Sequence, residues 1–148
     1  MNFTRSIATI AAVLCAPIAL AQTPPAGEVI YLDAAKAAEL FASSGSLGKG
    51  QDFSATVSVR TATGQVEVHN KETDIIYFLD GEATFVTGGT MVDGKLSSPD
   101  QYLGASITGG QEHQVKKGDF IVVPAGTPHW FKQVPKSVRY YVVKSIRP

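Results

Sequence analysis

Histidine is rare in this 148-residue chain, and its three copies are His69, His113 and His129. Carboxylate residues, a type that commonly binds metals, lie close to the first two in the sequence. Glu67 lies two residues before His69, so on a strand both side chains face the same side. Imidazole nitrogens and carboxylate oxygens together suit a divalent transition metal such as Mn, Fe, Ni or Zn. These residue types therefore predict a metal site.

The segment from Gly118 to His129 reads Gly-Asp-Phe-Ile-Val-Val-Pro-Ala-Gly-Thr-Pro-His. Gly118-Asp119 predicts a turn into a buried strand. Pro124-Ala125-Gly126 predicts a second turn, because proline fixes φ and glycine relieves strain. His129 then begins the returning strand, and the turn sets the direction of its side chain.

This segment resembles the second motif of the cupin superfamily: Gly, five residues, Pro-x-Gly, two residues, His. Every fixed position through His129 matches, whereas the family's final Asn, four residues after the His, is Gln133 here. The segment is thus similar to a cupin motif over twelve consecutive residues.

The first cupin motif is similar but degraded. Its usual form is His-x-His, three or four residues, Glu, six residues, Gly. Counting back from Gly81 puts Asp74 at the Glu position and His69 at the second His. Glu67 stands where the first His would be.

The resemblance covers roughly Asp52 to Lys144 and implies a small single-domain cupin of the type-2 conserved-barrel kind. The implied fold class is all-β: a double-stranded β-helix, or jelly-roll, cupin barrel with a short N-terminal helix. The implied metal ligands are His69, Asp74 and His129.

Glu67 and His113 are candidates for a fourth metal contact. Glu67 either replaces the missing His or is a salt-bridged or solvent-facing residue at the barrel rim. His113 shares strand parity with Val115, and so either completes the site, acts as a supporting residue or base, or is an ordinary polar strand residue. An alternative for His69 and His129 is a hydrogen-bonded pair in a pocket without metal.

The rest of the sequence predicts the strands that position these residues. From Asp52 onward, short apolar or alternating runs are broken by Gly and Pro, which is typical of a β-sandwich or barrel. Asp80-Gly81 is a strong turn signal, and the unpatterned stretch Asp93 to Gly104 predicts a surface loop. The predicted strands are 53–59, 66–69, 75–79, 83–86, 105–107, 111–115, 120–123, 129–134 and 138–146.

The N-terminal residues 1–21 predict a signal peptide. Arg5 is the only charge there, an apolar stretch runs from Ile7 to Leu20, and Ala19-Leu20-Ala21 matches the small-x-small cleavage pattern. A membrane anchor is the alternative, but the stretch is short for a span of ~20 residues. We therefore expect a periplasmic or secreted protein with no membrane contact after cleavage.

Residues 22–31 predict a linker or N-terminal arm, and residues 32–148 the barrel domain. Asp33 is expected to N-cap a helix that ends near Ser43, with an apolar stripe of Ala37, Leu40 and Phe41.

The amino-acid composition limits the classes of function that are expected for this protein. Hydrophobic residues make up 44% and charged residues 18%, which predicts one packed domain. The formal net charge is zero, so no basic face for a nucleic acid is expected. The only cysteine, Cys15, would leave with the signal peptide, so disulfides would not stabilise the mature chain.

Three functional hypotheses follow. The first is an exported metal-dependent enzyme of the oxygenase, isomerase or lyase type that acts on a small organic molecule in the barrel mouth. The second is a non-catalytic periplasmic module that binds a small ligand or a metal. The third is a structural barrel without metal. The resemblance also implies a homodimer.

Overall fold

The structure is a computed structural model that describes residues 27–147. The predicted signal peptide and the first residues of the predicted arm lie outside this range. Within it, no helix is long and apolar enough to cross a membrane. The described elements are one helix and twelve strands: α1 (Ala34–Ala42), β1 (Gly45–Lys49), β2 (Phe53–Arg60), β3 (Val66–His69), β4 (Glu72–Thr87), β5 (Thr90–Val92), β6 (Lys95–Ser98), β7 (Gln101–Gly104), β8 (Ser106–Thr108), β9 (Gln111–Lys116), β10 (Phe120–Val123), β11 (His129–Gln133) and β12 (Val138–Ile146).

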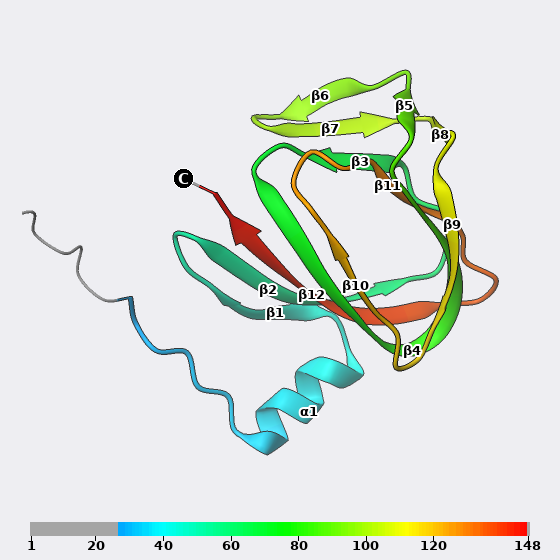
Figure 1. The fold of residues 1–148 in the computed structure, drawn as a ribbon. Helices are drawn as coiled ribbons and strands as arrows, with labels where there is room; N and C mark the ends of the chain where they lie inside the picture. Colours follow the sequence, from blue (N-terminus) through cyan, green and yellow to red (C-terminus); the bar gives the residue numbers. More distant parts are fainter. Residues whose placement is uncertain (1–26, 148) are drawn as a thin grey trace, which may run out of the picture.

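Ten of the described strands form two antiparallel layers that face each other (Figure 1), and β5 and β8 pair as a separate two-stranded sheet. One layer contains β1, β2, β12, the first half of β4 and β10. The other contains β9, the second half of β4, β11, β3, β7 and β6. The prediction of an all-β jelly-roll barrel with a short N-terminal helix is confirmed.

A single strand, β4, joins the two layers. The sequence predicts two strands separated by a turn at Asp80-Gly81, and this prediction is wrong. β4 instead runs for 16 residues, with Gly81 at a φ of 76°. Its pairing with β12 shifts register next to this point, between Arg139 and Tyr140. The glycine signal therefore marks a bend from one layer into the other.

The core lies between the layers. Phe78 and Phe85 are fully buried, and their rings lie 6.5 Å apart, edge to face. Phe131 and Tyr140 stack at 5.1 Å beside them. These aromatic contacts connect β4, β11 and β12, and so hold the two layers at a fixed separation.

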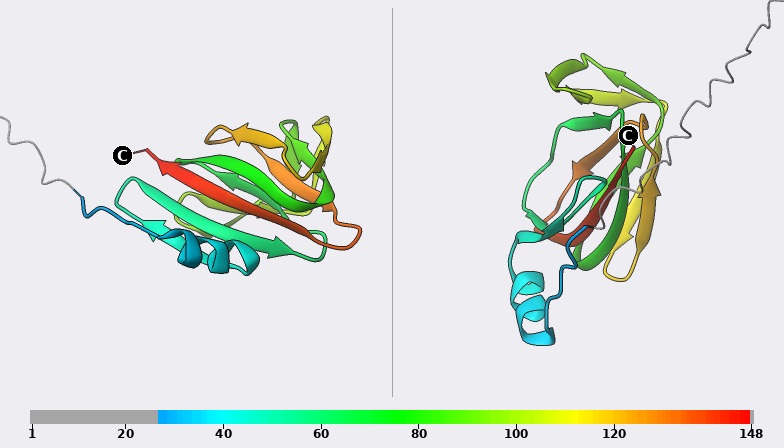
Figure 2. Two further views of the ribbon diagram at one scale, coloured as in Figure 1. Left: turned by 90° about the horizontal axis from the view of Figure 1, so that it is seen from below. Right: turned by 90° about the vertical axis from the view of Figure 1, so that its left-hand side faces the viewer.

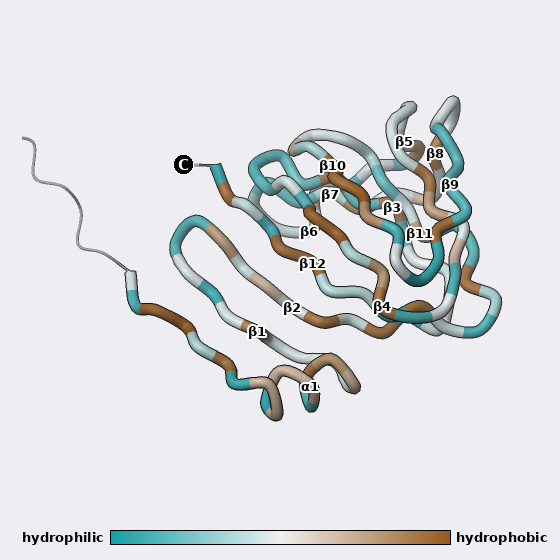
Figure 3. The backbone as a smooth tube through the Cα atoms, turned by 60° about the horizontal axis from the view of Figure 1, so that its bottom comes forward, coloured by the Kyte–Doolittle hydropathy of each residue, from teal (hydrophilic) through white to brown (hydrophobic). Residues whose placement is uncertain are grey.

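Strand β2 places its polar side chains inside the barrel. Thr56, Ser58 and Arg60 line an internal cavity, whereas Val57 is buried on the opposite face of the strand. Apolar and polar residues alternate along the strand (Figure 3). The core is thus supplied mainly by the other strands, and β2 contributes polar groups to the cavity.

Helix α1 covers part of the outer face of β1, β2 and β12 (Figure 2). Asp33 caps it by accepting a 2.8 Å hydrogen bond from the Lys36 N–H, as predicted. Of the predicted stripe, Phe41 packs against Tyr141 with ring centroids 6.1 Å apart. The helix therefore shields the apolar outer side of the sheet.

Two further expectations are corrected. The stretch Asp93 to Gly104 is not a loop, because it contains β6 and β7, which extend the second layer next to β3. β6 is exposed along its whole length, so it has no apolar alternation to detect. The strand after Gly118-Asp119 is buried on one face only, since Val123 belongs to the core whereas Phe120 and Val122 are 59% and 48% exposed.

We predict that Gly81→Ala destabilises the protein by roughly 2–4 kcal/mol. An added Cβ would lie 2.0 Å from the backbone oxygen of Ser137, and the positive φ adds conformational strain. Gly88→Ala is a matched control, since Gly88 has a φ of 72° and no neighbour within 4 Å of the added Cβ. Urea unfolding should show the larger loss for Gly81; equal losses would contradict the role of Ser137.

Candidate metal centre

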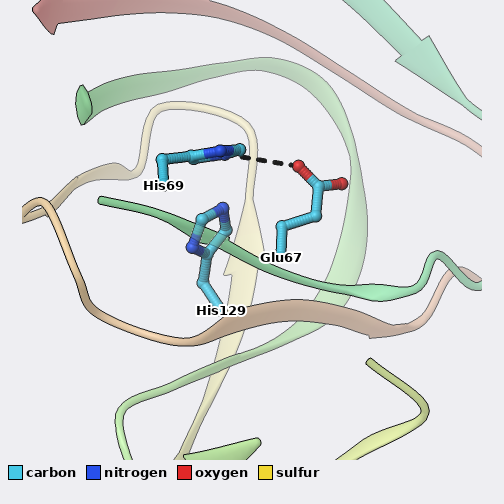
Figure 4. Close-up of side chains that lie close together, drawn as sticks. All are labelled: Glu67, His69 and His129. Atoms are coloured by element: carbon cyan, nitrogen blue, oxygen red, sulfur yellow. Dashed lines mark ion pairs between the residues drawn. The ribbon is translucent and has the colours of Figure 1, made fainter. Parts of the chain in front are cut away.

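Four of the predicted site residues come together between the layers. Glu67, His69 and His129 place ligand atoms within 4.8 Å of one another, and His69 forms a second such group with Glu72 and Asp74. Figure 4 shows the side chains of Glu67, His69 and His129 pointing toward one another. The register explains this, because His129 on β11 lies directly opposite Glu67 on β3.

The imidazoles and carboxylates converge on one small volume. His69 Nε2 lies 3.4 Å from Glu67 Oε2 and 3.6 Å from Asp74 Oδ2. His129 Nε2 lies 3.7 Å from the same Asp74 oxygen. Both histidines therefore present Nε2 to the same carboxylate.

The other ring nitrogen of each histidine contacts a polar group of the protein. His129 Nδ1 donates to the backbone oxygen of Thr127 at 3.1 Å, and His69 Nδ1 contacts the side-chain amide of Gln101. A backbone carbonyl only accepts, so Nδ1 of His129 carries a proton and its neutral ring keeps the lone pair on Nε2. His129 is therefore in the tautomer that can bind a metal through Nε2.

The turn before His129 is tied to His69 itself. The Gly126 N–H donates to the His69 backbone oxygen at 2.8 Å, and Gly126 has a φ of 83°. The Ala125 N–H donates to the Thr73 hydroxyl at 3.3 Å. The Pro-Ala-Gly turn thus fixes both histidine strands relative to each other, as its glycine and proline predict.

The environment shifts the pKa values of His69 and His129 in opposite directions. Burial lowers the pKa of His129, so its imidazole is neutral near neutral pH. Burial also acts to lower the pKa of His69, but the neighbouring carboxylates of Glu67 and Asp74 outweigh it and raise that pKa. A proton on His69 Nε2 would therefore compete with a metal for the same lone pair.

The pKa of Glu67 is lowered to about 2. Burial alone would raise it, but the ion pair with His69 and the charges of His129 and Arg60 outweigh burial. Arg60 is the cation on the other side of Glu67, with Nη2 at 3.4 Å from Oε1. Glu67 is thus an ionised pocket carboxylate rather than a solvent-facing rim residue.

Sequence reasoning missed two charged residues of the site, Lys144 and Glu72. Lys144 Nζ lies 2.8 Å and 3.1 Å from the two Asp74 oxygens, and 3.0 Å from Glu72 Oε2. Lys144 lies on the same face of its strand as Tyr140 and Val142, which are both buried. A lysine on this inward face was the sequence signal that could have identified it as a site residue.

His113 does not join the cluster. It lies on β9 opposite Phe85, and its Nε2 is 2.9 Å from the Thr87 hydroxyl. Neither group of potential ligands found within residues 27–147 includes it. The sequence correctly placed the His113 side chain on the inward face of its strand, but β4 lies between β9 and β11 in the sheet.

The cluster opens on a cavity of about 220 Å³. Its polar side is formed by Asp74, His129, Lys144 and the inner residues of β2, and its apolar side by Ile76, Phe131, Tyr140 and Val142. This volume lies below the ~300–1,000 Å³ of pockets that hold drug-sized ligands, so the cavity suits a smaller molecule.

The donor set fits a divalent transition metal. Two imidazole nitrogens and one or two carboxylate oxygens suit such an ion. In the described part of the chain, His69 Nε2 is also a buried nitrogen without a hydrogen-bond partner. A buried polar atom left unpaired is costly, and a metal ion would satisfy it.

We predict that Glu67→Gln flattens the acid dependence of stability in the metal-free protein. A carboxyl whose folded-state pKa is lowered stabilises the fold above its usual pKa of 4.5, and this stabilisation is lost as pH falls toward 2. Melting temperatures at pH 6, 4 and 3 should therefore fall less steeply in the variant. Glu39→Gln, on the exposed face of α1, should retain the wild-type slope; an unchanged slope in Glu67→Gln would contradict the assignment.

Comparisons with known proteins agree with this architecture. The structure is similar to protein TT1209 from Thermus thermophilus, with a TM-score of 0.50 and 17% sequence identity over 72% of this chain and 84% of that one. It is also similar to BH2720 from Bacillus halodurans, with a TM-score of 0.52 and 15% identity over 71% and 70% of the two chains. No curated protein matches the sequence.

The fold, the turn before His129 and the ring of imidazoles and carboxylates now have a common explanation in a family match. The family model described as cupin matches residues 23–147, which is most of the chain. This protein belongs to the cupin family.

Proposed function

We propose that this cupin binds one divalent transition metal and acts as a metal-dependent enzyme on a small organic molecule in its cavity. The ligands would be His69, His129 and Asp74, with Glu67 as the fourth contact. Mn, Fe, Ni and Zn all suit such a set.

One observation carries the proposal: the two Nε2 atoms are aimed at one carboxylate, while Nδ1 of His129 donates to a backbone oxygen and Nδ1 of His69 contacts the Gln101 amide. A structural histidine pair needs no such matched orientation. The unpaired, buried Nε2 of His69 supports the same interpretation.

The surrounding residues supply the rest of a reaction site. The apolar side of the cavity excludes water from a bound molecule, and Lys144 places three N–H donors next to Asp74. A bound metal would supply Lewis-acid chemistry and a coordination position for the substrate. The chain thus combines a polar, charged wall with an apolar one, as small-molecule sites do.

A non-catalytic ligand-binding or metal-binding module is the second candidate. The Lys144 contact with both Asp74 oxygens supports it, because an ammonium on this carboxylate competes with a metal ion. Metal-dependent conversion of any small molecule would favour the enzyme. Stabilisation by a ligand without turnover would favour the module.

We predict that His69→Ala with His129→Ala removes nearly all bound metal. The double variant loses both nitrogen ligands, and metal-dependent stabilisation of the fold should disappear with them. Elemental analysis after Zn²⁺ loading and gel filtration measures the metal, and melting with and without Zn²⁺ measures the stabilisation. His113→Ala, outside the cluster, should keep wild-type metal. A double variant with full metal content would place the site elsewhere.

We also propose that a second copy of the chain covers the outer face of β10, giving a homodimer. Phe120 and Val122 are exposed there, next to Tyr77 and Ile75 of β4, and contiguous exposed apolar side chains are typical of interfaces. Light scattering should give twice the mass of one chain. Phe120→Ser with Val122→Ser should give a folded monomer, and a monomeric wild type at micromolar concentration would contradict the proposal.

A further inference from the structure

The cavity has a second cationic group, Arg60, which the proposed metal site does not use. Arg60 lies at the end of β2 and lines the same cavity as Asp74, His129 and Lys144. Its side chain is 27% exposed, so most of it is withdrawn from solvent. A largely buried guanidinium needs an anionic partner to offset the loss of its hydration.

The partners of Arg60 within the protein leave its hydrogen-bonding capacity incompletely used. Its contact with Glu67 is long, at 3.4 Å, and Glu67 is shared with His69. Within residues 27–147, the Nε atoms of Arg60 and Arg139 are both buried without a hydrogen-bond partner, but Arg60 lines this cavity and Arg139 does not. The guanidinium presents five donors in a rigid fork that matches a carboxylate.

The barrel holds this guanidinium in a defined position. Arg60 Cζ lies 4.9 Å from the centroid of the Phe131 ring, which provides a cation–π contact. On another side is the backbone of Gly64, where a Cβ would lie only 2.4 Å from Nη1. Gly64 is itself fixed, because its N–H donates to the Phe131 oxygen and its oxygen accepts from the Trp130 indole. Gly64 thus leaves room for the guanidinium.

The charge balance of the cavity depends on the metal. Two cations, Arg60 and Lys144, face three carboxylates: Glu67, Glu72 and Asp74. With both imidazoles neutral, the carboxylates prevail by one charge when no metal is bound, and a divalent ion reverses the sign. A metal that takes Glu67 as a ligand would also weaken the hold of Glu67 on Arg60.

We propose that the cavity binds a small organic carboxylate, and that Arg60 pairs with the carboxylate group. The inference rests on the proposed function, because the metal provides the charge that makes an anion the preferred occupant. Thr56 and Ser58 lie on the same inner face of β2 and offer hydroxyl groups along the path from Arg60 toward Lys144. Arg60 is therefore a specificity-determining residue for the charge of the substrate.

The test uses the full mature protein, both Zn²⁺-loaded and EDTA-treated. Calorimetric titration with acetate, succinate and benzoate is compared with titration with their primary amides, which have similar shapes without the charge. We expect the Zn²⁺ form to bind at least one carboxylate roughly tenfold or more tightly than its amide, and more tightly than the EDTA-treated form does.

Three variants assign the preference to Arg60. Arg60→Gln should remove it while retaining bound Zn²⁺, and Gly64→Ala should weaken it by displacing the guanidinium without changing the charge. Arg139→Gln is the matched control, because Arg139 lies on β12 opposite Val59, on the strand face that does not line the cavity. It should bind like the wild type.

The outcomes separate this inference from the proposed function. Equal binding of carboxylates and amides, or an unchanged preference in Arg60→Gln with normal Zn²⁺ content, overturns the inference and leaves the metal site intact. A wild type that takes up no metal overturns the proposed function. If the wild type takes up no metal, a carboxylate preference that depends on Arg60 still supports the inference about Arg60. If that preference is also absent, the inference is overturned as well.

Discussion

The pairing of one bent strand with four others is the constraint on which the molecule depends. β4 pairs with β10 and β12 before Gly81 and with β9 and β11 after it. Asp74 lies on the first half of this strand, and Thr87, at the end of the second half, lies opposite His129. The distance between Asp74 and His129 is therefore set by the bend as well as by the turn before His129.

The second constraint is the cost of placing several charges in a partly dry cavity. Asp74 and His129 are almost fully buried, and an isolated carboxylate in such a position would be strongly destabilising. Each charged group has a partner: Lys144 for Asp74 and Glu72, and Arg60 for Glu67. These pairs offset part of the cost of burying the carboxylates, and a metal that binds Asp74 would have to displace Lys144 from it.

The sequence was sufficient to predict the fold class and most of the cluster, because local signals determine both. Pro124-Ala125-Gly126 favours a turn because proline fixes φ and glycine adopts a positive φ, and the alternation around Glu67 and His69 predicts which side chains share a face. Lys144 could not be placed in this way. Its contact with Asp74 joins residues 70 positions apart, and it depends on the register of β12 against β4.

Other errors have similar physical causes. Asp80-Gly81 predicts a positive φ, which suits a hairpin turn and a bend equally well, and only the partner strands decide between them. His113 has the expected parity but the wrong neighbouring strand. β6 and β10 were misjudged because one has no buried face and the other exposes the apolar side chains of Phe120 and Val122.

The inward polar face of β2 has a consequence for how such a barrel can diversify. Because the buried aromatic packing comes from β4, β11 and β12, residues such as Thr56 and Ser58 contribute little to folding free energy. Substitutions at these two positions would alter the shape and polarity presented to a ligand while the scaffold stays intact. Ligand choice and thermodynamic robustness are therefore encoded on different strands, and selection can change one without eroding the other.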